Sequence, residues 1–215
     1  MEDYRKTKYC KPLDGIQERK AKVRQSVLAD HPGAVDMHKY VSDNSEKYKM
    51  EFMEAYNFKC AYCGASIHLI PIGSFEVDHY INQKSDRFST KKDAGDINNL
   101  VLACHDCNHS KNAFPITEEN EEDLNPDKEN ILSNFCRDDM FYIKPTEHGK
   151  NNQNVTCFYE RLHLGSEIHR IDYLVMSMIG LEEELKTKGV EHVELLKAIN
   201  ILKNKRNLMS IYADN

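Results

Sequence analysis

Two pairs of cysteines, each with two residues between its members, constrain most strongly how this chain can fold. The pairs are Cys60–Cys63 and Cys104–Cys107, and 40 residues lie between them. Zinc binds four thiolates in a tetrahedron, and a two-residue gap lets one turn present two sulfurs to the same ion. We therefore predict a structural zinc that joins the two ends of this segment. Four thiolates leave no coordination position open, so this zinc is expected to take no part in catalysis.

Histidines near the two pairs are alternative zinc ligands. They are His68, His105 and His109. The chain contains seven cysteines, an odd number, and the metal-type spacing of four of them indicates a reducing compartment rather than a disulfide framework. We therefore expect the protein in the cytoplasm.

The composition is that of a soluble globular protein, with an uneven distribution of charge. The 215 residues are 40% hydrophobic and 30% charged, and no apolar run approaches the roughly 18–20 residues that span a bilayer. The N-terminus lacks the apolar stretch of a secretory signal. The net charge is −6, but residues 1–25 hold eight basic residues against four acidic ones, while residues 116–140 hold nine acidic residues against two basic ones. Because local basic surface governs phosphate contact, the total charge does not exclude nucleic acid as a ligand.

A second set of polar residues lies between the cysteine pairs and just after them. Asp78 and His79 are adjacent, Asn99 follows, and Asn108 and Lys111 lie three residues apart on one face of a predicted helix. Carboxylate and amide oxygens suit Mg²⁺ or Mn²⁺. A histidine that titrates near neutral pH suits a general base. The combination is typical of a metal-dependent phosphodiesterase.

Together with the cysteines, these residues resemble the HNH endonuclease family. That family places a cysteine pair, an Asp–His dipeptide, an Asn–Leu segment, and a second cysteine pair followed by His or Asn and a basic residue. The resemblance covers about residues 50–115. It implies the ββα-metal fold, in which a hairpin and a helix hold one divalent ion.

The resemblance and the chemistry of the side chains together assign a role to each residue. Asp78 and Asn108 would bind Mg²⁺ or Mn²⁺, which neutralises charge on the phosphate and on the leaving oxygen. His79 would be the general base that activates water. The resemblance further implies that Asn99 steadies the loop and orients His79, and that Lys111 contacts phosphate.

The metal ligands and the shape of the strand at this site are open to alternatives. Glu76 and His109 are alternative metal ligands, and many HNH enzymes have histidine where this chain has Asn108, a change that favours hard ions. Adjacent residues of a strand point to opposite faces. Asp78 and His79 can therefore share a site only if their strand ends, bulges or bends there.

The predicted fold is α+β and mostly helical, with a ββα-metal core stapled by the four-cysteine zinc. Helices are expected over residues 14–30, 45–57, 168–188 and 190–211, the last two as an antiparallel pair. In the core we expect a hairpin from 67–70 and 75–81, a loop over 82–97, a strand at 100–103 and a short helix at 106–113. The expected divisions are an N-terminal helical arm (1–49), a nuclease core (50–115), an acidic linker (116–140) and a C-terminal helical region (141–215).

The favoured function is a metal-dependent DNA endonuclease, with RNA as an alternative substrate. The size, the HNH centre and the helical flanks loosely resemble the nuclease subunit of Septu-type anti-phage systems, which pairs with an ABC-type ATPase. That resemblance implies docking through the N-terminal arm or the C-terminal helices. A stand-alone restriction-like or homing-type nuclease, and a zinc-knuckle nucleic-acid-binding module without catalysis, are the alternatives.

Overall fold

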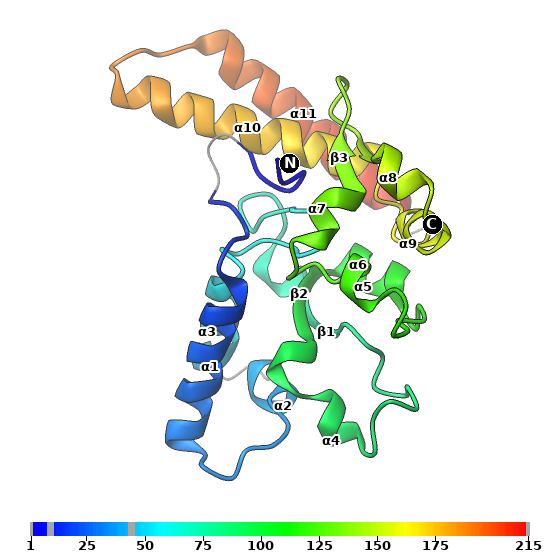
Figure 1. Ribbon diagram of the computed structural model, residues 1–215. Helices are drawn as coiled ribbons and strands as arrows, with labels where there is room; N and C mark the ends of the chain where they lie inside the picture. Colours follow the sequence, from blue (N-terminus) through cyan, green and yellow to red (C-terminus); the bar gives the residue numbers. More distant parts are fainter. Residues whose placement is uncertain (1, 8–10, 43–45, 214–215) are drawn as a thin grey trace.

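The computed structural model describes residues 2–7, 11–42 and 46–213, which form a mostly helical α+β fold (Figure 1). The sheets in this part of the chain are two small antiparallel pairs of strands. This agrees with the predicted fold class. None of the helices among these residues is long and apolar enough to cross a membrane.

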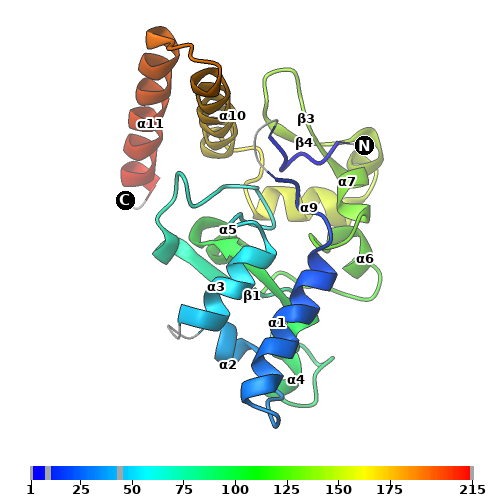
Figure 2. The ribbon, with the colours of Figure 1, turned by 90° about the vertical axis from the view of Figure 1, so that its left-hand side faces the viewer.

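The N-terminal helices are α1 (Ile16–Asp30), α2 (His38–Val41) and α3 (Glu46–Ala55). The helices predicted at 14–30 and 45–57 are confirmed within these bounds, whereas α2 was not foreseen. In α1, the apolar residues Ile16, Val23 and Val27 recur at helical spacing and are buried. This stripe faces α3, so the two helices pack against each other (Figure 2).

The central region contains β1 (Phe75–His79), β2 (Leu100–Cys104) and α5 (His105–Lys111). The strands are antiparallel, with Phe75 opposite Cys104 and His79 opposite Leu100. The strand and helix predicted at 100–103 and 106–113 are confirmed. The segment predicted to be the hairpin partner of β1, residues 67–70, instead forms turns. All five residues of β2 are apolar and buried. Pairing β1 with β2 therefore removes more apolar surface from water than pairing it with residues 67–70 would.

The connection between these strands is partly helical. It contains α4 (Lys91–Ala94), with a capping box between Thr90 and Asp93, and a 3₁₀ turn at Ile97–Asn99. The loop predicted over residues 82–97 is therefore interrupted by a short helix.

Residues 116–140, predicted to be an acidic linker, contain short helices and a strand. The elements from here to residue 161 are α6 (Glu121–Leu124), α7 (Asn130–Asn134), β3 (Phe135–Arg137), β4 (Ile143–Pro145), α8 (Glu147–Lys150) and α9 (Gln153–Arg161). Leu124, Ile131 and Phe135 are buried in the same hydrophobic core as the N-terminal helices and the central strands. Glu118, Glu119 and Glu122 are exposed around these apolar anchors, whereas the Asp127 carboxylate is buried. The domain boundaries at 49, 115 and 140 remain predictions.

The chain ends in the predicted antiparallel helix pair, α10 (Glu167–Thr187) and α11 (Val193–Ala213), which lie side by side at one end of the molecule (Figures 1 and 2). Gly189, at φ 71°, allows the chain to reverse between them. The pair has a small hydrophobic cluster of its own, centred on Ile171, Val175 and Ile199. A buried ion pair between Asp172 and Arg206, with an O–N distance of 2.6 Å, crosses from one helix to the other.

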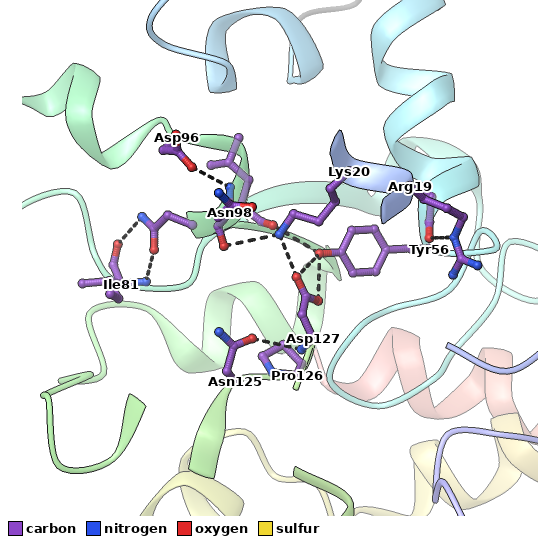
Figure 3. Close-up of polar contacts among 12 residues, drawn as sticks. Arg19, Lys20, Tyr56, Ile81, Asp96, Asn98, Asn125, Pro126 and Asp127 are labelled. Atoms are coloured by element: carbon purple, nitrogen blue, oxygen red, sulfur yellow. Dashed lines mark hydrogen bonds and ion pairs between the residues drawn. The ribbon is translucent and has the colours of Figure 1, made fainter. Parts of the chain in front are cut away.

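A second buried ion pair ties α1 to the acidic stretch (Figure 3). The Lys20 ammonium lies 2.7 Å from the Asp127 carboxylate and donates to the backbone carbonyl of Asn98 at 3.3 Å. Both charged side chains are fully buried. The Tyr56 hydroxyl also donates to Asp127, at 2.9 Å, and lies 3.2 Å from the carbonyl oxygen of Leu100. This network attaches the N-terminal helices to the chain entering β2.

We predict that Asp127→Ala lowers the free energy of unfolding by about 3–5 kcal/mol, because it leaves the buried Lys20 ammonium without a counter-charge. Urea unfolding measures this change. Glu122→Ala is the matched control, since Glu122 pairs with Lys128 at the surface and its loss should change stability by less than about 1 kcal/mol. The double variant Lys20→Met/Asp127→Leu should be more stable than Asp127→Ala. Equal losses in Asp127→Ala and in Glu122→Ala would contradict the assignment.

Candidate functional site

The four paired cysteines converge on one buried point. The sulfurs of Cys60, Cys63, Cys104 and Cys107 all lie within 4.8 Å of one another, and all four residues are buried. The Cys63 and Cys104 sulfurs are 3.8 Å apart. A zinc tetrahedron with bonds of about 2.3 Å has edges of roughly 3.8 Å, so the sulfurs fit this ion.

The local backbone supports this arrangement at the first pair. Gly64 has φ 80°, and a side chain there would meet the Arg5 backbone at 2.9 Å, so only glycine fits. Its N–H donates to the Cys60 carbonyl at 2.9 Å, which closes the turn between the two sulfurs. In the second pair, Cys104 ends β2 and Cys107 lies in α5. A zinc here would join the first turn to the junction of strand and helix.

The histidines considered as alternative zinc ligands do not belong to this group. Among the described residues, the side chains that converge with metal-ligand geometry are the four cysteines. His68 is exposed, and His105 donates to the Glu76 carboxylate at 2.6 Å. The donor set is therefore four thiolates, which is compatible with a structural zinc.

A separate polar cavity of about 440 Å³ opens where β1 meets α5. Asp78, His79 and Asn108 all line it, so the structure brings together the three side chains predicted to do the chemistry. His79 is the last residue of β1. The strand therefore ends where the sequence required it to end, and two neighbouring side chains can face one cavity. The predicted residues Asn99 and Lys111 are not on its wall.

Asp78 is buried and held at both carboxylate oxygens. The Tyr62 hydroxyl donates to Oδ2 at 2.6 Å, and the Lys111 ammonium lies 3.1 Å from Oδ1 and 2.9 Å from Oδ2. Burial raises the pKa of Asp78, while Lys111 and Tyr62 act in the opposite direction. The carboxylate direction is therefore fixed by the protein.

The position of Lys111 suggested a phosphate ligand, but its ammonium group does not face solvent in the structure. Its side chain is fully buried, and besides Asp78 it donates to the His79 carbonyl at 2.9 Å. The last turn of α5 is thus bound to the end of β1 through one ammonium group. A catalytic role for Lys111 stays a prediction, and this geometry suits the positioning of Asp78 better than phosphate contact.

His79 lies against a second histidine that sequence reasoning missed. Its ring stacks on that of His38 in α2, with centroids 4.4 Å apart and an angle of 26° between the ring planes. His38 Nε2 lies 3.3 Å from the carbonyl oxygen of Val77. Burial lowers the pKa of His79 to about 4; His38 also lowers it, and Asp36 raises it. His79 is therefore neutral at pH 7 and can accept a proton.

Asn99 forms hydrogen bonds with the two residues that follow His79. Its backbone carbonyl accepts from Tyr80 N–H at 2.8 Å, and its side-chain oxygen accepts from Ile81 N–H at 2.8 Å. Its amide group donates to the carbonyls of Ile81 and Ala94, at 3.0 and 2.8 Å. Asn99 thus fixes the loop after His79 without touching the cavity.

Asn108 is oriented by Glu76, which lies on the same face of β1 as Asp78. The amide NH₂ of Asn108 donates to the Glu76 carboxylate. Because the NH₂ and the oxygen of an amide point in different directions, the Asn108 oxygen points away from Glu76. Burial raises the pKa of Glu76, but hydrogen bonds from His105 and Asn108 outweigh it and hold that pKa below its usual value. Glu76, considered above as an alternative ligand, is therefore engaged with Asn108.

Residues 60–114 match the sequence model of the HNH endonuclease family. The matched segment contains both cysteine pairs, β1, β2 and α5. No curated protein and no solved structure matches the chain. The family match and the four-cysteine cluster together indicate a metal-dependent nuclease domain with a zinc-type centre.

We predict about one zinc per chain, which four thiolates would hold as part of the fold. Cys63→Ser should release the metal and abolish cooperative thermal unfolding, because the first turn is no longer joined to β2 and α5. Elemental analysis and circular dichroism measure the two effects. Cys157→Ser is the matched control, since Cys157 is exposed and lies in α9. A Cys63→Ser protein with full zinc content and an unchanged melting temperature would exclude this site.

Proposed function

We propose that this protein is an endonuclease that hydrolyses DNA phosphodiester bonds with one hard divalent ion, Mg²⁺ or Mn²⁺. The observation that carries the proposal is the cavity in which Asp78, His79 and Asn108 meet. A carboxylate, an amide oxygen and a neutral imidazole are the groups that a one-metal hydrolysis requires.

The donor set fits a hard divalent ion. Asp78 offers a carboxylate and Asn108 an amide oxygen, both hard oxygen ligands. Mg²⁺ keeps several waters and is often held by one or two protein groups plus substrate phosphate. When bound, the ion would neutralise charge on the phosphate and on the leaving oxygen. His109, the other alternative ligand, also lines the cavity.

The remaining residues would position these groups. His79 would take the proton from the attacking water, because its imidazole is neutral at pH 7. Lys111 and Tyr62 hold the Asp78 carboxylate, and Asn99 holds the loop after His79. The general base and the metal ligand are thus fixed before substrate arrives, which lowers the reorganisation needed for reaction.

The basic arm offers fewer phosphate contacts than its composition suggested. Arg5, Arg19 and Lys20 all donate to backbone carbonyl groups of the protein. These three cations serve the fold. We therefore assign phosphate contact to the rim of the cavity, where Asn82, Gln83 and Asn112 supply amide groups.

We further propose that the nuclease is an anti-phage effector in the cytoplasm, gated by an ATPase partner. The C-terminal helix pair supports this context, because α11 exposes the large apolar residues Val193, Leu196, Ile201 and Leu208. The N-terminal arm is the other candidate docking segment. A stand-alone nuclease would cut without any partner.

We predict that His79→Ala lowers the rate of plasmid cutting by about 10²–10⁴-fold, the usual contribution of a general base. Supercoiled plasmid with Mg²⁺ or Mn²⁺ is the substrate, and the nicked and linear products are quantified. His148→Ala is the matched control, because His148 is exposed in α8.

Two other outcomes of the plasmid experiment would lead to different conclusions. Equal cutting by wild type and His79→Ala would contradict the mechanism. If zinc-loaded, folded wild type does not cut, adding the ATPase partner separates a gated nuclease from a binding module without catalysis.

A further inference from the structure

A second cavity, of about 520 Å³, lies along an adjoining face of α5, between that helix and the C-terminal helices. His105 and His109 contribute from α5, His163 and Ser166 from the connection between α9 and α10, His169 from α10, and Met209 from α11. The walls therefore combine imidazole rings, hydroxyl groups, apolar side chains and one carboxylate, that of Asp106.

Two residues of this wall each have a buried polar atom without a hydrogen-bond partner. The atoms are His169 Nδ1 and Ser166 Oγ. His169 is only 4% exposed. Leaving such groups unpaired is costly, and they are normally satisfied. Both residues line the cavity, and a turn of either side chain can bring its unpaired atom to a ligand bound there.

The arrangement does not suit a metal ion. Within the described ranges, the four cysteines are the group whose ligand atoms converge within metal distance, and the cavity histidines are not among them. The rings of His105 and His109 are nearly parallel, at 17°, with centroids 5.7 Å apart. Flat rings, apolar side chains and a few hydrogen-bonding atoms are the features that bind a planar heterocycle.

The cavity is next to the candidate catalytic site. His109 lines both cavities, and its neighbour Asn108 lines the catalytic one. Successive residues of a helix point about 100° apart, so α5 presents the two cavities on adjoining faces. A strand whose phosphate lies at Asn108 can therefore place the base of a flanking nucleotide in the second cavity.

We propose that this second cavity binds one unstacked nucleobase of the nucleic-acid strand that is cut. This inference rests on the proposed nuclease function and specifies how the strand is held. His169 Nδ1 and Ser166 Oγ pair with the edge of the base, and the imidazole rings and Met209 contact its faces. Because a paired base must first leave its stack, the protein binds single-stranded or distorted sites better than a perfect duplex.

The test compares the affinities of two proteins for two oligonucleotides. Fluorescence anisotropy measures the four dissociation constants. A labelled single-stranded oligonucleotide is compared with one whose central nucleotides lack bases, without added Mg²⁺ or Mn²⁺ so that neither is cut. Wild type should bind the intact strand roughly tenfold more tightly, as expected for one stacked base. His169→Leu should reduce this ratio towards one by weakening binding of the intact strand alone.

The matched control is His192→Leu, since His192 is exposed in the turn between α10 and α11 and should keep the wild-type ratio. Ser166→Ala is a second variant that removes a single hydroxyl, and it should lower the ratio even if His169→Leu does not fold. Zinc content and melting temperature verify the fold of each protein. A ratio near one in wild type, or an unchanged ratio in both cavity variants, would overturn the proposal.

Two further measurements separate the remaining outcomes. If adenosine or cytidine monophosphate binds as tightly as the intact strand, the cavity serves a free nucleotide and the proposal is overturned. Plasmid cutting with Mg²⁺ is measured in parallel. Plasmid cutting together with a binding ratio near one overturns the base cavity alone. A high binding ratio with no cutting, even when the ATPase partner is added, overturns the proposed nuclease alone.

Discussion

The central region depends on bringing four sulfur atoms within 4.8 Å of one another, although 40 residues separate the two pairs. One pair lies in a turn, while the other spans the end of β2 and the first turn of α5. The direction in which α5 leaves the sheet is therefore set at the sulfurs. Because Asn108 directly follows Cys107, the geometry of the candidate active site follows from that of the thiolate cluster.

The candidate active site uses buried charge to gain rigidity at some cost in stability. Lys111 and Asp78 lose their hydration on burial, and such pairs often contribute little net stability. Here the ammonium also binds the His79 carbonyl, so one group fixes both residues of the Asp–His dipeptide. This arrangement restrains side chains that must not drift, as expected of a site organised before its ligand arrives.

The sequence predicted the features that show as regular spacing or as a motif. It did not predict the contacts between residues far apart in the chain. The cysteine pairs, the helices α1, α3, α10 and α11, and the meeting of Asp78 with Asn108 could be inferred from periodicity and from family resemblance. The stacking of His38 on His79 could not, because 40 residues separate them and α2 has only four residues. The pairing of β1 with β2 was not predicted, because the apolar segment 67–70 is nearer to β1 in the sequence and was taken as its partner. The short helices within residues 116–140 were not predicted, because the acidic composition outweighed the few apolar side chains that pack into the core.

The contact between His38 and His79 also bears on where the working unit of this protein begins. The family match starts at residue 60, yet the ring beside the proposed general base comes from a helix before it. Lys20 likewise binds the backbone at Asn98, immediately before Asn99. A fragment cut at the limits of the family match would keep the zinc ligands and the residues that line the cavity. It would lose the His38 ring beside His79 and the Lys20 contact next to Asn99. The contacts that hold the proposed general base therefore extend beyond the segment that defines the family.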